Sequence, residues 1–148
     1  MKKLLVIQKQ SIMPEKKKDS MLSLVLSGNP QSTNHIYKAT CRGRFASIYM
    51  SKKGKDLKED YKWQVKSQYH GKPLTQDLKM ALDLFFGDKR VRDIDNYNKL
   101  ILDALSGLVF EDDKQIQELN IKKFYDKENP RCNIKIYKVY PLSPTKVD

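Results

Sequence analysis

Residues 78–86 constrain the fold most, because apolar side chains fill every second position of this stretch. A period of two is typical of a β-strand that buries one face. Residues 96–108 then follow a helical period, and residues 115–125 and 132–140 return to the composition of strands. A strand, a helix and two further strands in this order predict a sheet with a helix packed on it.

The first half of the chain adds a strand and a long helix to this unit. Apolar residues alternate with their neighbours over residues 22–26, which predicts another strand. Ser51 is a favourable N-cap for a helix that would run to about Tyr69. Its apolar stripe consists of Leu57, Tyr61 and Val65. Residues 36–50 fit either a loop or an irregular hairpin, and the pattern does not decide between them.

The fold predicted is α+β, a single domain with a mixed four-stranded β-sheet and two main α-helices packed on it. A chain of 148 residues is long enough for one domain with a substantial core. We place this domain at residues 21–142. Residues 1–20 are interpreted as an N-terminal arm or an extra strand, and residues 143–148 as a C-terminal tail.

The charge balance points to a polyanionic partner. The chain has 29 Lys and Arg against 18 Asp and Glu, for a net charge of +11. Such an excess makes nucleic acid the first candidate. Lys55, Lys58, Lys62 and Lys66 would form one basic stripe on the predicted helix. For a single lysine a solvated surface is the simpler interpretation, whereas for the row a track for phosphates is about as probable.

Several protein classes are excluded by the sequence. No apolar run approaches the ~20 residues that cross a bilayer. Cys41 and Cys132 lie far apart, and with only two histidines they make no zinc motif. Reduced thiols and the absence of a secretory signal predict a cytoplasmic location.

The segment from Arg92 to Lys99 carries the chemistry. In an extended backbone Asp93 and Asp95 would point to the same side, and Lys99 would lie one turn into the next helix. Asp112 and Asp113 follow the far end of that helix. Carboxylates without histidine or cysteine suit Mg²⁺, for which Mn²⁺ would substitute. Such a metal would activate water against a phosphodiester.

The basic residues of this segment have matching interpretations. Lys99 would hold the scissile phosphate or stabilise its charge, and Arg92 would clamp it with two hydrogen bonds. A purely structural explanation also remains open. Asp95 is a suitable helix N-cap, Asp95–Lys99 and Lys99–Asp103 have the spacing of surface ion pairs, and the two acids after the helix form a plausible turn.

The sequence RDIDNYNKLILDAL over residues 92–105, followed by GLVFEDDKQI, resembles the RusA family of Holliday junction resolvases, found in bacteria and their prophages. That family has the pattern Arg-Asp-x-Asp-Asn-x-x-Lys, an Asp-Ala-Leu helix, and then Asp-Asp-x-Gln. Upstream, Pro30, Ser32 and Asn34 resemble its early loop.

The resemblance implies a Mg²⁺-dependent homodimeric endonuclease of the prophage type that makes paired symmetric nicks in four-way DNA junctions during recombination and repair. The metal carboxylates would be Asp93, Asp95 and Asp113, with Lys99 and Arg92 as catalytic basic residues and Asp112 in a lesser role. Further DNA contacts are assigned to Asn34, Lys89, Arg90 and the lysine row.

Two other functions stay open at this stage. One is a basic phage protein that binds DNA without cutting it. The other is a metal nuclease of the same fold with a different branched substrate. Neither a membrane partner nor a small-molecule cofactor is expected.

Overall fold

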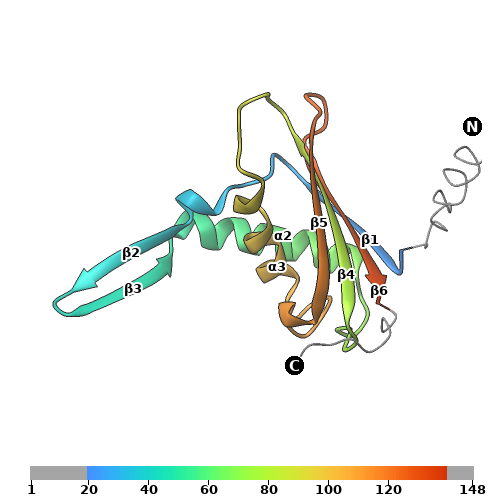
Figure 1. Cartoon of the computed structure of the whole chain (residues 1–148), viewed down its shortest axis with the longest axis horizontal. Coiled ribbons are helices and arrows are strands. Elements are labelled where there is room, and N and C mark those ends of the chain that lie inside the picture. Colours follow the sequence, from blue (N-terminus) through green and yellow to red (C-terminus); the bar gives the residue numbers. More distant parts are fainter. Residues whose placement is uncertain (1–19, 140–148) are drawn as a thin grey trace, which may run out of the picture.

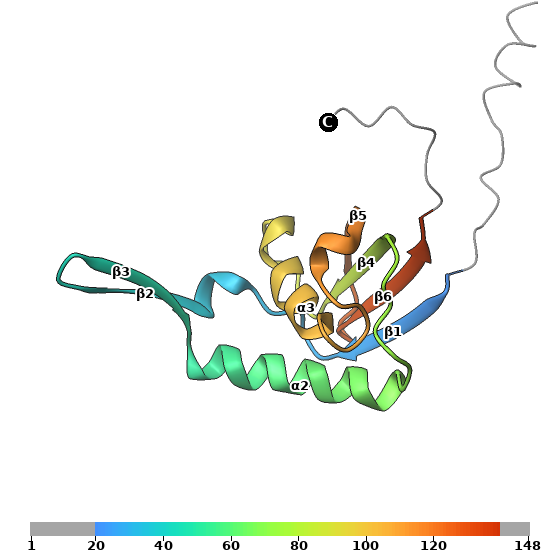
Figure 2. The ribbon, with the colours of Figure 1, turned by 90° about the horizontal axis from the view of Figure 1, so that it is seen from below.

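The computed structural model describes residues 20–139, in which a four-stranded sheet is covered on one face by two helices (Figures 1 and 2). The helices are α2 (Lys52–Gln68) and α3 (Asn98–Leu105). The strands are β1 (Leu22–Ser27), β6 (Arg131–Lys138), β4 (Leu78–Phe86) and β5 (Ile116–Tyr125), in this spatial order. The α+β fold with a mixed sheet and two helices is therefore confirmed. The N-terminal arm and C-terminal tail lie outside the described residues, except for Ser20.

The central strand β4 makes the sheet mixed. It pairs with β6 in antiparallel and with β5 in parallel orientation, while β1 pairs with the far side of β6 in antiparallel orientation. A parallel pair requires a crossover connection, and α3 lies within the segment that joins β4 to β5. This connection carries the motif of residues 92–99 to one end of β4.

The alternation predicted for β4 is confirmed by its burial. The even-numbered residues from Leu78 to Phe86 are buried, whereas the odd-numbered ones are half-buried on the opposite face. The buried face packs against side chains of both helices. The helix residues in this core are Tyr61, Val65, Leu100, Ile101, Ala104 and Leu105. Removing these apolar surfaces from water is the main stabilising contribution to the domain.

The long helix α2 begins where the sequence predicted. The Ser51 hydroxyl accepts a hydrogen bond from the Gly54 backbone amide at 3.2 Å. Further along the helix, the side chains of Gln64 and Gln68 form hydrogen bonds with backbone groups of the edge strand β1. The Val25 amide donates to Gln68 Oε1 at 2.8 Å, and Gln68 Nε2 donates back to the Val25 carbonyl at 2.7 Å. These side-chain amides thus provide hydrogen-bond partners for the open edge of β1, whose other edge pairs with β6.

The second helix is shorter than the predicted 96–108. A 3-10 turn, η2 (Ile94–Asn96), precedes it, and α3 itself ends at Leu105. Gly107 adopts a φ of 83°, which stops the helix, and its amide donates to the Phe110 carbonyl at 2.7 Å. Tyr97, Leu100 and Ala104 are buried as expected for the apolar face.

Residues 36–50, for which the sequence did not decide between a loop and a hairpin, contain a regular two-stranded hairpin of β2 (Tyr37–Arg42) and β3 (Phe45–Met50). We call this hairpin the arm; it is distinct from the N-terminal arm predicted for residues 1–20. It extends away from the sheet beyond one end of α2, as both ribbon views show (Figures 1 and 2). A 3-10 turn, η1 (Thr33–His35), leads into it. Among the described residues, no helix is both long and apolar enough to cross a membrane.

Candidate active site

The loop after β4 holds Arg92 against the body of the protein. Its guanidinium lies 4.4 Å from the ring centroid of Phe86 and forms an ion pair with Asp88 at 2.7 Å. The amide of Arg90 and the Arg92 guanidinium both donate to the Asp88 carboxylate, which lowers its pKa. Arg92 is therefore already engaged with a carboxylate and an aromatic ring. A free two-point phosphate clamp does not fit this position.

Asp93 and Asp95 follow immediately and are exposed. Asp93 has extended backbone, but Asp95 lies inside the turn η2, so the two are not same-face residues of a strand as predicted. Asp93 makes no capping bond to this turn, and α3 begins after Tyr97 without a side-chain cap. The interpretation of Asp95 as the helix N-cap is wrong. Within residues 20–139 neither carboxylate is in an ion pair.

Lys99 lies one turn further along, beside a residue from the arm. Its ammonium is 5.0 Å from the ring centroid of Tyr37, the first residue of β2. The Tyr37 hydroxyl donates to Asp103 Oδ2 at 2.8 Å. Desolvation and then this hydrogen bond raise the pKa of Tyr37 to about 12, so the hydroxyl stays a donor at neutral pH. The surface pairs expected between Lys99 and Asp95 or Asp103 are not among the ion pairs of the described residues.

The acidic pair after α3 serves two purposes. Asp112 caps the turn η3 (Asp113–Gln115) by accepting from the Lys114 amide at 3.0 Å, and Gln115 Oε1 accepts from the Asp112 amide at 2.9 Å. Asp112 is thus structural. Asp113 is exposed, and the hydrogen bond it shares with Asp112 is the main reason why its pKa is raised.

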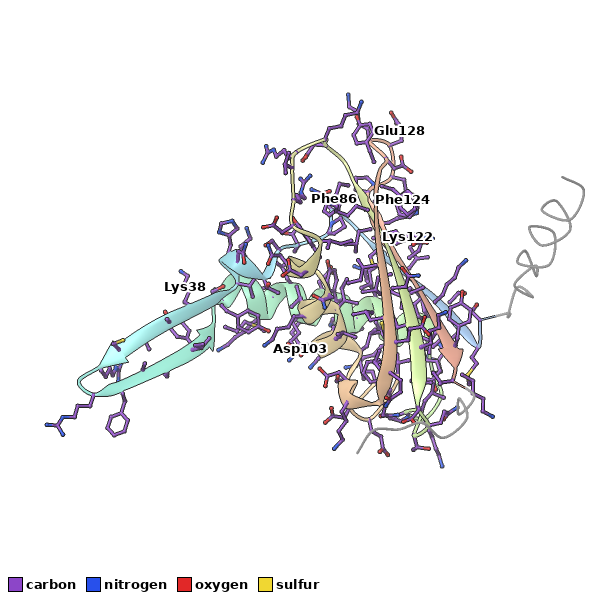
Figure 3. The ribbon with its side chains drawn as sticks, in the orientation of Figure 1. Lys38, Phe86, Asp103, Lys122, Phe124 and Glu128 are labelled. Atoms are coloured by element: carbon purple, nitrogen blue, oxygen red, sulfur yellow. The ribbon has the colours of Figure 1, made fainter. Side chains whose placement is uncertain are left out.

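The charges of two other side chains affect the pKa of Asp113. The negative charge of Asp103 raises its pKa further, and the positive charge of Lys99 lowers it. These effects on Asp113 indicate that Asp103 and Lys99 lie near its carboxylate. In Figure 3, Asp103 lies on α3, between the arm that carries Lys38 and the sheet.

The donor set suits a hard divalent cation, although the described residues hold no ready-made cage. No group of three or more His, Cys, Asp or Glu side chains within residues 20–139 is arranged to hold a metal. Mg²⁺ needs only one or two carboxylates, since water and phosphate oxygens complete its shell. Asp93, Asp95 and Asp113 are exposed carboxylates that fit such a role, which stays a prediction.

The predicted DNA contacts fall on two sides of this region. The lysine row of α2 flanks the buried stripe of the helix on the side opposite Gln64 and Gln68. Lys55 and Lys66 are exposed, whereas Lys62 forms an ion pair with Glu59 at 3.7 Å. Asn34 is exposed in η1, whose Thr33 hydroxyl donates to the Asn96 carbonyl at 3.1 Å. The hydrogen bond fixes this loop beside the segment of Asp95.

Lys89 and Arg90 lie at a hollow beside Arg92. Its rim combines cations with aromatic rings, and Phe86 and Phe124 lie at the same end of β4 and β5 (Figure 3). Lys123 reaches across from β5 and donates to the Arg92 carbonyl. The residues lining the hollow are Phe86, Asp88, Lys89, Arg90, Arg92, Lys123, Phe124 and Tyr125.

Sequence reasoning missed Tyr37 and treated Asp103 only as a partner of Lys99. Tyr37 is distant from the motif in sequence, and it lies in the segment whose structure stayed undecided. The Asp88–Arg92 pair has helical spacing but lies in a loop, so no periodicity pointed to it.

Comparison with known proteins identifies the family of this chain. A family model described as endodeoxyribonuclease RusA matches residues 27–137. An uncharacterized protein of Bacillus subtilis (strain 168), YqaN, is 45% identical over 47 residues, which are 32% of this chain and 32% of that protein. The chain thus matches about a third of the length of this relative. The family match includes both strands of the arm, the motif of residues 92–99 and the acidic pair. The chain belongs to the RusA endodeoxyribonuclease family.

Proposed function

We propose that this protein is a Mg²⁺-dependent, structure-selective endodeoxyribonuclease that resolves four-way DNA junctions by paired symmetric nicks. The observation that carries the proposal is that the exposed carboxylate of Asp113 feels the charge of Lys99, which the exposed Asp93 and Asp95 closely precede in the sequence, in a chain of net charge +11. Carboxylates repel phosphate, so a DNA-binding protein that keeps them at such a place needs a cation between the two.

The residues divide the work in the following way. Asp93, Asp95 and Asp113 would hold the metal, which when bound supplies an activated water and stabilises charge on the phosphodiester. Lys99 would bind a non-bridging oxygen of the scissile phosphate and stabilise the charge that develops there. Because Arg92 is held by Asp88, its role would be to fix the backbone before Asp93.

Tyr37 and Asp103 would position Lys99. The Tyr37 ring faces the Lys99 ammonium, and its hydroxyl is anchored on Asp103. An ammonium over a ring is attracted without a formal ion pair, which leaves its N–H groups available for phosphate. A lysine neutralised by a carboxylate would lose that capacity.

A four-way junction has two symmetry-related cut sites, and a two-fold dimer would present one active site to each. We therefore include a homodimer in the proposal. In this assembly paired nicks would follow from equal distances between the two sites and the branch point.

The test uses a synthetic four-way junction and a linear duplex with the same arms, each with and without Mg²⁺. Asp93→Asn should abolish nicking while junction binding survives, because the amide keeps the shape and removes the charge. Asp56→Asn is the matched control, since Asp56 is an exposed carboxylate on α2 outside the site. Full cleavage by Asp93→Asn would overturn the metal assignment.

Other outcomes separate the remaining functions. Binding without nicking of any substrate would indicate a DNA-binding protein that does not cut. Equal nicking of junctions, flaps and duplexes would leave a metal nuclease without selectivity for four-way junctions. Symmetric nicks on the junction alone, lost in Asp93→Asn and kept in Asp56→Asn, are the expected result.

A further inference from the structure

The arm has two faces of different chemistry. Residues paired across an antiparallel hairpin project to the same side, so the register of β2 and β3 assigns each face. One face carries the pair Tyr37–Met50 at its base and then small or apolar pairs, Ala39 with Ile48 and Cys41 with Ala46. The other, which we call the cationic aromatic face, carries the pairs Lys38–Tyr49, Thr40–Ser47 and Arg42–Phe45.

The cationic aromatic face is open to solvent and hollowed. Five of its residues line one shallow depression: Thr40, Arg42, Phe45, Ser47 and Tyr49. The side chain of Phe45 is 81% exposed, and that of Tyr49 is 49% exposed. Two large exposed rings on one narrow hairpin are unusual for a surface that contacts only water.

The charge of the arm is of one sign. Residues 37–50 contain Lys38, Arg42 and Arg44 and no Asp or Glu. Cations interleaved with aromatic rings are typical of surfaces that hold a nucleic-acid backbone while bases stack on the rings. A second copy of the same face would instead oppose cation to cation, so self-association through this face is disfavoured.

The arm also starts at the candidate active site. Its first residue, Tyr37, is the residue that touches both Lys99 and Asp103. By the register, Tyr37 projects on the side of Ala39 and Ile48, so a DNA strand with a phosphate at Lys99 would cross the base of the arm to reach the cationic aromatic face. Each strand of the arm spans about 20 Å, which corresponds to about six nucleotide steps. The arm is long enough to follow a strand from the cut site toward a branch point.

We propose that the cationic aromatic face of the arm binds DNA at the branch point. Lys38 and Arg42 contact phosphates, and Phe45 and Tyr49 stack on bases that the branch leaves without a neighbour. This inference rests on the proposed function, and it assigns to the arm the recognition of branched rather than continuous duplex. Phosphate contacts give affinity for any DNA, whereas stacking needs an unstacked base.

The test measures binding without cleavage, by fluorescence anisotropy in EDTA on a four-way junction and on a linear duplex. The double variant Phe45→Ala/Tyr49→Ala should weaken junction binding by about 10-fold or more and duplex binding by less than about 2-fold. Arg42→Ala should weaken both and reduce the slope of log affinity against log salt by about 0.9. Ile48→Ala is the matched control, because this side chain is 77% exposed on the opposite face.

Unchanged junction binding by Phe45→Ala/Tyr49→Ala would overturn the proposal. An equal loss of junction binding in Ile48→Ala, together with a protein mass halved in sedimentation equilibrium, would also overturn it. The arm would then be an interface between copies of the chain. Circular dichroism of each variant checks that it is folded. Failure of the proposed function has a different signature, namely wild-type protein that binds the junction and nicks no substrate in Mg²⁺. The EDTA assay reports on the arm in either case.

Discussion

Replacing Tyr37 by phenylalanine tests whether the arm and the helix α3 cooperate at the site. The change removes the hydroxyl that donates to Asp103 at 2.8 Å and keeps the ring beneath the Lys99 ammonium. A hydrogen bond to a charged acceptor contributes about 1.5–3 kcal/mol, and the lower value applies because Tyr37 is only half-buried. If that whole contribution positions Lys99 in the transition state, cleavage falls by about 10-fold.

The assay is single-turnover cleavage of a four-way junction at saturating protein, with junction affinity measured in parallel. A positioning role predicts a slower cleavage rate at nearly unchanged affinity. Tyr137→Phe is the control, since it removes a half-buried tyrosine hydroxyl on β6, far along the chain from the motif. Cleavage by Tyr37→Phe at the wild-type rate would refute the reasoning, as would a loss that merely follows the loss of folded protein in urea titrations.

Two further predictions concern stability. Gly54→Ala should destabilise the domain by about 1–3 kcal/mol in urea, because the added Cβ would lie 2.0 Å from the buried Ile36 Cγ2; an unchanged midpoint would contradict this. Asp88→Asn should lower the melting temperature at pH 7 and much less at pH 3. The pKa of Asp88 is lowered by its hydrogen bonds, so its stabilisation is present above the unfolded pKa of about 3.9 and is lost as pH falls through the folded value. Equal shifts at both pH values would argue against this ion pair.

The sheet could be predicted because its signal is local. The alternation of residues 78–86 reports directly which face is buried, and Ser51 marks the start of α2 through its own side chain. Both depend on neighbours a few positions away. The arm gives no such signal, since its strands bury neither face and their side chains are mostly exposed.

The site was predicted less completely, for a related reason. Residue types and spacing identify Asp93, Asp95 and Lys99 as a chemical motif, but they do not say which partners each side chain has. Tyr37 reaches Asp103 across 66 positions of the sequence, and only the tertiary fold makes that contact. The turn η2 likewise replaces the extended backbone expected at Asp95, immediately before α3 begins.

The structure also shows which charged residues form ion pairs and where the others lie, whereas composition gives only their number. Two arginines, Arg92 and Arg131, are half-buried and paired with Asp88 and Asp126, so these four charges fix loops at the end of the sheet. The carboxylates proposed to hold the metal, Asp93, Asp95 and Asp113, are exposed and make no ion pair within residues 20–139, and they would repel DNA unless a divalent cation neutralised them. Among residues 20–139, further positive charges lie on α2, on the arm and beside the hollow. Net charge would thus bring the molecule to DNA, whereas the position of the cut would depend on the metal that Asp93, Asp95 and Asp113 are proposed to hold.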